Sequence, residues 1–147
     1  MKKVAVILVI FLMILGVTAA PSLAKADKCP LQPCSVGWPD GLGSGFVIFN
    51  DSSGGPQNLE VTVSLKGATE LAGTTLNVFL FVDWDWYGGG PVGTVTVNKA
   101  GNATFHVNAL VKKNTWHKLG IDLAVGASDR YEFGVGHNEP PLNKFFK

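Results

Sequence analysis

The stretch Leu59-Glu60-Val61-Thr62-Val63-Ser64-Leu65 decides the fold class of this chain. Its apolar side chains occupy every second position, and polar side chains fill the positions between them. Successive side chains of a β-strand point to opposite faces. A period of two therefore predicts a strand with one face in a core and the other in solvent.

Further runs of the chain repeat this alternation. We expect strands over residues 76–82, 94–97, 103–111 and 117–125, with outer strands at 46–50 and 131–135. Turn sequences rich in Gly, Asn, Asp, Ser and Pro separate the runs, and no segment shows a sustained helical period. About seven short strands at this spacing predict an all-β domain, a single antiparallel β-sandwich of immunoglobulin-like type.

The first 26 residues have the layout of a secretory signal peptide. Two lysines precede an apolar run from Val4 to Ala20, and small-x-small cleavage sites end at Ala24 and Ala26. We therefore expect residues 1–26 to be removed and the mature protein to be secreted. The alternative is an uncleaved N-terminal membrane anchor, because a run of 17 residues is at the lower limit for crossing a bilayer. No later segment is long and apolar enough to span a membrane.

Length and composition indicate one globular domain. The chain has 147 residues, of which 46% are hydrophobic and 16% charged, and its formal charge of +1 gives no reason to expect nucleic acid as a partner. Residues 27–44 are rich in Pro and Gly and predict an irregular arm, followed by the sandwich over 45–136. For the C-terminal tail, 137–147, docking on the sheet, disorder, a membrane contact and a partner contact all stay open.

Cys29 and Cys34 are the only cysteines. Export to an oxidising compartment predicts a disulfide between them, which would staple the N-terminal segment. Their spacing differs from the Cys-x-x-Cys of oxidoreductases, and no further metal ligands lie nearby.

One polar pair stands out when the alternating runs are paired as hairpins. Pairing Val111 with His117 places His106 directly opposite Asp122. A histidine beside a carboxylate can support catalysis or orient a metal ligand. No nucleophile can be placed next to this pair, so we expect a solvent-facing ion pair rather than a catalytic site.

The histidines also give no reason to expect a metal or another cofactor. A blue-copper site needs two histidines, a cysteine and commonly a methionine, and neither Cys nor Met occurs after Cys34. His106 and His117 also lie on opposite faces by parity.

The most unusual stretch is Asp83-Trp84-Asp85-Trp86-Tyr87-Gly88-Gly89-Gly90, at the end of an expected strand. Asp83 and Asp85 have oxygen ligands suited to Ca²⁺, but the remaining ligands of a calcium loop are missing. Trp84 continues the inward parity of its strand, so we expect it to cap the core. Trp86 and Tyr87 would then be free to stack on a sugar ring or to anchor a protein partner. The candidate binding residues are therefore Asp83, Asp85, Trp86 and Tyr87.

Two other surface features follow from the alternation. Phe79 and Phe81 lie on the face opposite the core side of their strand, so either the N-terminal arm or the C-terminal tail covers them or they form an oligomer contact. Asn50 and Asn102 begin Asn-x-Ser/Thr sequons and are candidate glycosylation sites.

The run from Gly93 to Asn108, with Asn98, Gly101 and Asn102 in its turn, resembles a hairpin of uncharacterised secreted immunoglobulin-like domains. In that hairpin Val97 would pair with Phe105. The resemblance implies a fold and an extracellular setting, and it carries no activity.

Three functions are consistent with these features. The first is a secreted non-catalytic module with a cell-surface structural role or a role in binding a protein or glycan. The second is a carbohydrate-binding module that uses Trp86 and Tyr87 with Trp38 or Trp116, which coplanar exposed rings would favour. The third is a small hydrolase or metalloenzyme built on the histidine and carboxylate side chains above, which requires a pocket that holds at least two of them.

Overall fold

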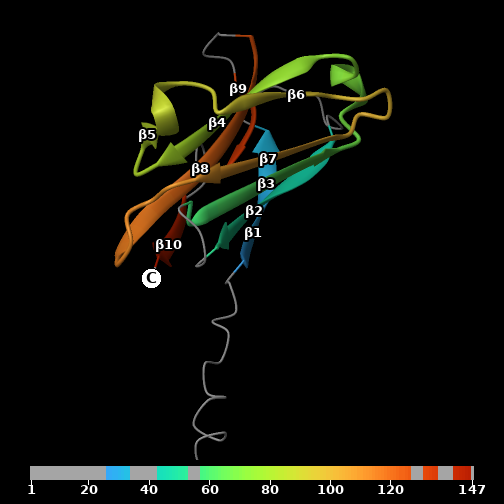
Figure 1. Cartoon of the computed structure of the whole chain (residues 1–147). Helices are drawn as coiled ribbons and strands as arrows, with labels where there is room; N and C mark the ends of the chain where they lie inside the picture. Colours follow the sequence, from blue (N-terminus) through green and yellow to red (C-terminus); the bar gives the residue numbers. More distant parts are fainter. Residues whose placement is uncertain (1–25, 34–42, 53–56, 127–130, 136–140, 147) are drawn as a thin grey trace, which may run out of the picture.

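The computed structural model describes residues 26–33, 43–52, 57–126, 131–135 and 141–146 (Figure 1). These residues form strands and two short 3-10 helices, and no α-helix occurs among them. The elements are β1 (Ala26–Pro33), β2 (Ser44–Asp51), β3 (Leu59–Lys66), η1 (Thr69–Leu71), β4 (Thr75–Val82), β5 (Asp85–Trp86), η2 (Tyr87–Gly89), β6 (Gly93–Thr96), β7 (Ala103–Ala109), β8 (Thr115–Val125), β9 (Tyr131–Val135) and β10 (Leu142–Phe146).

The strands form two antiparallel sheets that enclose one core. The first sheet has the order β1-β2-β3-β7. The second has β4 and β8 at its centre, with β5 and β6 along the outer edge of β4 and β9 and β10 along the outer edge of β8. The prediction of an all-β, sandwich-like fold is confirmed.

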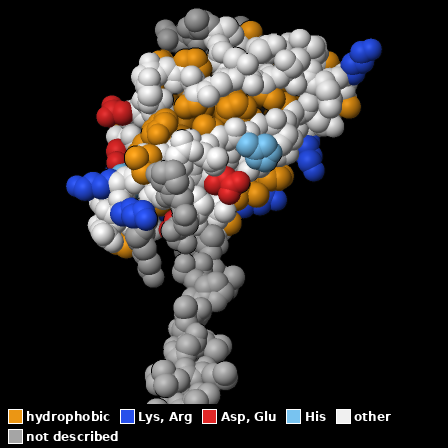
Figure 2. Space-filling view, viewed as in Figure 1, with side chains coloured by type: hydrophobic (Ala, Val, Ile, Leu, Met, Phe, Trp, Pro, Cys, Tyr) orange, Lys and Arg blue, Asp and Glu red, His pale blue; other side chains and the backbone are white. Residues whose placement is uncertain are grey.

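β1 belongs to both sheets. Its residues 26–31 pair with β2, and its last two residues, Gln32 and Pro33, pair with Gly134 and Phe133 of β9. Along the opposite side β6 pairs only with β4 and β7 only with β3, so the described sheets are not joined there. Figure 2 shows a band of hydrophobic side chains along this opening.

Most of the core-facing side chains that the alternation predicts are buried, but Val125, also predicted to face inward, is 37% exposed. In β3, β4 and β8 the residues at every second position are almost fully buried: Leu59, Val61, Val63, Leu65, Leu76, Val78, Leu80, Leu119, Ile121 and Leu123. All buried hydrophobic residues of the described structure lie between Leu31 and Phe146. A chain that starts at Ala26 therefore contains the whole described core.

The expectation of an irregular arm over residues 27–44 is wrong for its first part, because Ala26–Pro33 is strand β1. Pro30 and Pro33 interrupt any alternation here and argue against a central strand. Up to Leu31, however, β1 pairs with β2 alone, and proline is tolerated where one edge of a strand makes no ladder hydrogen bonds. Leu31 contributes to the core.

The predicted disulfide is not present, because Cys29 has a free thiol. Cys29 lies in β1, and the strand continues to Pro33. At about 3.3 Å per residue the chain is about 13 Å from Cys29 at Pro33, while the two Cα atoms of a disulfide are less than about 7 Å apart. Cys34 lies outside the described residues. Burial raises the pKa of the Cys29 thiol, the Asp27 carboxylate raises it further, and Lys144 opposes this.

Residues 142–146 of the tail dock on the second sheet as strand β10, which pairs with β8. Its buried residues include Phe146 and Lys144. The Lys144 ammonium donates hydrogen bonds to the Asp27 carboxylate at 2.7 Å and to the Phe49 carbonyl at 3.2 Å. The Lys144 side chain thus connects β10, the last described strand, to β1, the first described strand.

Both predicted hairpins are wrong. β7 pairs with β3, and β8 pairs with β4, so the chain crosses from one sheet to the other between residues 109 and 115. Val97 likewise does not pair with Phe105, because β6 pairs with β4 and Phe105 lies opposite Val63. Alternation determines which face of a strand is buried, but it does not determine the neighbouring strand.

The predicted signal peptide falls almost entirely outside the described residues. In the described part of the chain, no helix has the length and apolarity needed to cross a membrane.

Candidate functional site

The predicted pair of His106 and Asp122 does not form. His106 is exposed on β7 of the first sheet, where its Nδ1 lies 2.9 Å from Thr62 Oγ1. Asp122 lies in β8 of the second sheet, opposite Phe79, and is only 1% exposed. The two side chains lie in different sheets because the predicted hairpin between β7 and β8 does not exist.

A two-residue turn formed by Asp83 and Trp84 connects β4 to β5, since Val82 pairs with Asp85. The φ angles of Asp83 and Trp84 are 55° and 74°, and a tight hairpin of type I′ needs positive φ at both positions. Aspartate tolerates this left-handed conformation, whereas a bulky aromatic residue adopts it rarely. The turn takes Trp84 out of the strand alternation, and 59% of the residue is exposed. The prediction that Trp84 caps the core is wrong.

Contacts of the Asp83 carboxylate hold this turn against β8. Oδ1 accepts a hydrogen bond from the Lys118 backbone N–H at 2.9 Å, and Oδ2 lies 2.7 Å from His117 Nδ1. Burial acts to raise the pKa of Asp83, but the hydrogen bonds from Lys118 and His117 outweigh it, so the pKa is lower than its ordinary value. These hydrogen bonds therefore stabilise the ionised carboxylate form of Asp83.

His117 is a positioning group rather than an available base. It is 6% exposed, and its Nε2 lies 2.9 Å from the Lys112 carbonyl oxygen. A carboxylate and a carbonyl oxygen are both hydrogen-bond acceptors, so each ring nitrogen faces an acceptor within hydrogen-bond distance. Both nitrogens are therefore occupied, and the ring links Asp83 to the loop before β8.

The acidic residues of this stretch do not assemble a metal site. Asp83 is engaged as above, and Asp85 is exposed on β5. Within the described residues, no three His, Cys, Asp or Glu side chains form a group that could hold a metal ion.

The two aromatic residues predicted to be free for a ligand also make contacts inside the fold. Trp86 is 39% exposed and covers the outer face of β4, with its ring centroid 4.9 Å from that of Phe79 and 6.1 Å from that of Phe81. The cover of Phe79 and Phe81 thus includes β5, where we expected the arm or the tail. The Tyr87 ring packs against the core, and its hydroxyl accepts a hydrogen bond from the Leu110 backbone N–H at 2.9 Å.

The most exposed rings of the described structure lie on the outer face of the second sheet. Trp116 is 66% exposed and lies opposite Phe145, which is 40% exposed, with the ring centroids 5.5 Å apart. Lys118 follows on the same face of β8, and its Nζ lies 5.3 Å from the centroid of the Trp84 ring. Trp84, Trp116 and Phe145 therefore form a strip with Lys118 in its middle, which we call the aromatic cluster.

Sequence reasoning named Trp116 only as a secondary candidate and did not name Phe145. The alternation along β8 places Trp116 on the same face as Lys118, and this was the sequence signal that its ring is exposed. Phe145 could not be placed, because nothing in the tail predicted its pairing with β8.

The aromatic cluster lies at the end of the sandwich where the described chain begins and ends. The Asn114 N–H donates to the Phe146 carbonyl at 2.7 Å, so the loop before β8 lies beside the end of β10. The salt bridge from Lys144 to Asp27 places the start of β1 near the same strand. In Figure 1 the C-terminus and the start of β1 both lie at the lower end of the sandwich.

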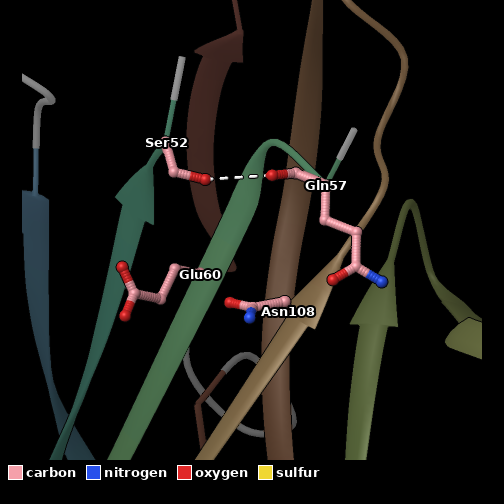
Figure 3. A pocket seen from close by; sticks show the side chains of 4 residues that line it. All are labelled: Ser52, Gln57, Glu60 and Asn108. Carbon is pink, nitrogen blue, oxygen red and sulfur yellow. Dashed lines mark hydrogen bonds between the residues drawn. The ribbon is translucent and has the colours of Figure 1, made fainter. Parts of the chain in front are cut away.

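A polar depression of about 340 Å³ lies at this end on the first sheet, lined by Ser52, Gln57, Glu60 and Asn108 (Figure 3). Glu60 and Asn108 are cross-strand neighbours, and the Ser52 hydroxyl donates to the Gln57 carbonyl at 3.0 Å. The lining offers hydrogen-bonding groups but neither an aromatic ring nor a base next to the hydroxyl. It does not make a catalytic arrangement.

The two sequons differ in accessibility. Asn50 lies half-buried in β2, and its Nδ2 donates to Glu60 Oε2 at 3.2 Å. Asn102 is exposed in the turn before β7. Of the two, Asn102 presents the more accessible acceptor.

Comparisons of the chain with protein-family models, with curated proteins and with solved structures found no match.

Proposed function

We propose that this chain is an exported, non-catalytic binding module of the cell surface, with an immunoglobulin-like sandwich as scaffold and the aromatic cluster as its binding surface. One observation carries the proposal: Trp84 is held in a left-handed conformation while more than half of it is exposed. Backbone strain persists where the surrounding structure enforces it, and it concentrates at functional positions. An exposed ring gains little packing energy to offset such strain. We therefore assign the Trp84 side chain a role in binding rather than in stabilising the fold.

The contacts around the turn support this view. The Asp83 carboxylate and the buried His117 ring fix the backbone beneath Trp84. A rigid aromatic anchor loses little entropy when a ligand binds, which makes it effective at an interface.

The geometry gives less support to the alternatives. The Trp116 and Phe145 rings are tilted by 58°, whereas a flat sugar platform needs coplanar rings. An enzyme would need at least two of the predicted groups together, but His106 and Asp122 lie in different sheets and His117 has both ring nitrogens engaged.

The test is co-sedimentation of the chain from Ala26 with isolated cell envelopes. We expect wild type to pellet with envelopes and the Trp84→Ala/Trp116→Ala variant to stay in the supernatant. Val125→Ala is the matched control, because Val125 is an exposed hydrophobic residue at the opposite end of β8. Equal pelleting of wild type and the double variant would refute the aromatic cluster as the binding surface.

A further inference from the structure

We propose that the aromatic cluster binds the surface of a lipid bilayer that contains anionic lipid. This inference rests on the proposed function and names its ligand. It depends on three observations: the distribution of exposed apolar side chains, the lysines among them, and the place where the N-terminal segment joins the domain.

Four of the six exposed large hydrophobic residues of the described structure lie at one end of the sandwich, whereas Trp86 covers β4 and Val125 lies at the opposite end of β8. The aromatic cluster is joined there by Leu110, which is 58% exposed in the segment between β7 and β8. Tryptophan side chains favour the level of the lipid headgroups, because their apolar ring can be buried while the indole N–H stays in a polar environment. The tilt between Trp116 and Phe145 does not matter for such a ligand, because lipid chains adapt to an irregular surface.

Lysines surround this apolar surface. Lys112 and Lys113 are exposed in the loop before β8, and Lys118 lies between Trp84 and Trp116. Of the neighbouring acidic groups, Asp83 contacts His117, and Asp85 is exposed on β5. Beside the aromatic cluster itself these three lysines outnumber the two carboxylates, which complements the negative surface of anionic lipids. The other carboxylates at the same end, Asp27, Asp51 and Glu60, belong to strands of the first sheet.

In the uncleaved form, the alternative to a cleaved signal peptide, the connection to the N-terminal segment holds this same end near a membrane. The apolar run ends at Ala20, and β1 begins at Ala26. Six residue steps span at most about 20 Å. Whenever the run from Val4 to Ala20 lies in a bilayer, the start of β1, and with it the aromatic cluster, is held within reach of the lipid headgroups.

Vesicle co-sedimentation tests the inference with the chain from Ala26, which contains the described core and lacks the apolar run. We expect binding to vesicles of phosphatidylcholine with phosphatidylglycerol, and weaker binding to phosphatidylcholine alone. Trp84→Ala/Trp116→Ala should weaken binding by about tenfold or more, as expected for the loss of two buried rings. Neutralising Lys112, Lys113 and Lys118 to Gln should weaken it by about fivefold per lysine.

Two matched controls lie at the opposite end of the sandwich. Val125→Ala and Lys99→Gln, the latter in the exposed turn before β7, should bind the vesicles as wild type does. Circular dichroism of each variant shows whether the sheet structure is retained.

The outcomes separate this inference from the proposed function. Absence of vesicle binding, or equal binding by wild type and the tryptophan variant, overturns the lipid inference. If the tryptophan variant still loses envelope binding in that case, the proposed function stands with a protein or a glycan as the ligand. If wild type binds neither vesicles nor envelopes, both proposals fall.

Discussion

Replacing Trp84 by glycine or by alanine tests whether the turn between β4 and β5 stores strain to expose a ring. Both replacements remove the indole and its contact with Lys118, whose Nζ lies 5.3 Å from the ring centroid. They differ in how each residue tolerates the φ angle of 74° at this position. The comparison between Gly and Ala therefore isolates the backbone.

The expected difference follows from two opposing effects. A left-handed conformation costs an L-residue about 1–2 kcal/mol, and glycine avoids this cost. Glycine loses more conformational entropy on folding than alanine, by about 0.4–1 kcal/mol. The Gly variant should therefore be more stable than the Ala variant by about 0.5–1 kcal/mol, which is the reverse of the order expected within a strand.

Urea unfolding followed by circular dichroism measures this difference. The same pair of variants at Thr62, in the middle of β3, is the control, and there Ala should be the more stable. If the Gly variant at position 84 is no more stable than the Ala variant, the turn is not strained, and the observation that carries the proposed function is lost.

Three further predictions concern the contacts that hold this end together. Asn58→Ala removes both hydrogen bonds between the buried Asn58 amide and the backbone of Val111 and should destabilise the fold by about 2–4 kcal/mol in urea unfolding, and a loss below about 1 kcal/mol would contradict the role of this clamp. For Asp83→Asn, the lowered pKa of the carboxyl means that its contribution is present above the ordinary value of 3.8 and is lost as the pH falls through the lower folded value. The stability difference from wild type should thus be largest near neutral pH and shrink in acid, and a difference independent of pH would show that the charge of Asp83 has no role. Lys144→Met leaves the Asp27 carboxylate without its 2.7 Å partner and should cost about 2–3 kcal/mol, less than for a fully buried pair because Asp27 is partly exposed. The double variant with Asp27→Asn should recover part of this loss, and strictly additive losses would argue against direct coupling.

The sequence predicted the core-facing residues of the sheets because these residues alternate along each strand, although in β8 the other face, with Asp122 and Ala124, is buried too. Leu59 to Leu65 and Leu119 to Leu123 alternate in this way, and their inward residues are buried as expected. The alternation could not predict which strands pair with one another. A strand that forms a hairpin and one that crosses to the other sheet bury the same alternate residues, so β7 and β8 gave no sign that they belong to different sheets.

The candidate site was predicted only in part, because its geometry depends on a turn and on a distant strand. Asp83 was named for its carboxylate, but its partner His117 follows only from the pairing of β4 with β8. Trp84 was assigned inward by parity, which ends where the turn begins. Asn-Gly or Asp-Gly is the usual sequence of such a turn, and Asp83-Trp84 departs from it.

β1 pairs with strands of both sheets, and this affects the order in which the domain can fold. Its pairing with β2 can form early, but Gln32 and Pro33 need β9, and Asp27 needs Lys144, which lies 117 residues away. Contacts this distant in sequence are slow to form. One flank of the core thus stays open until β9 and β10 have made their contacts with β1, and a deletion that removes β1 or β10 would expose that same flank.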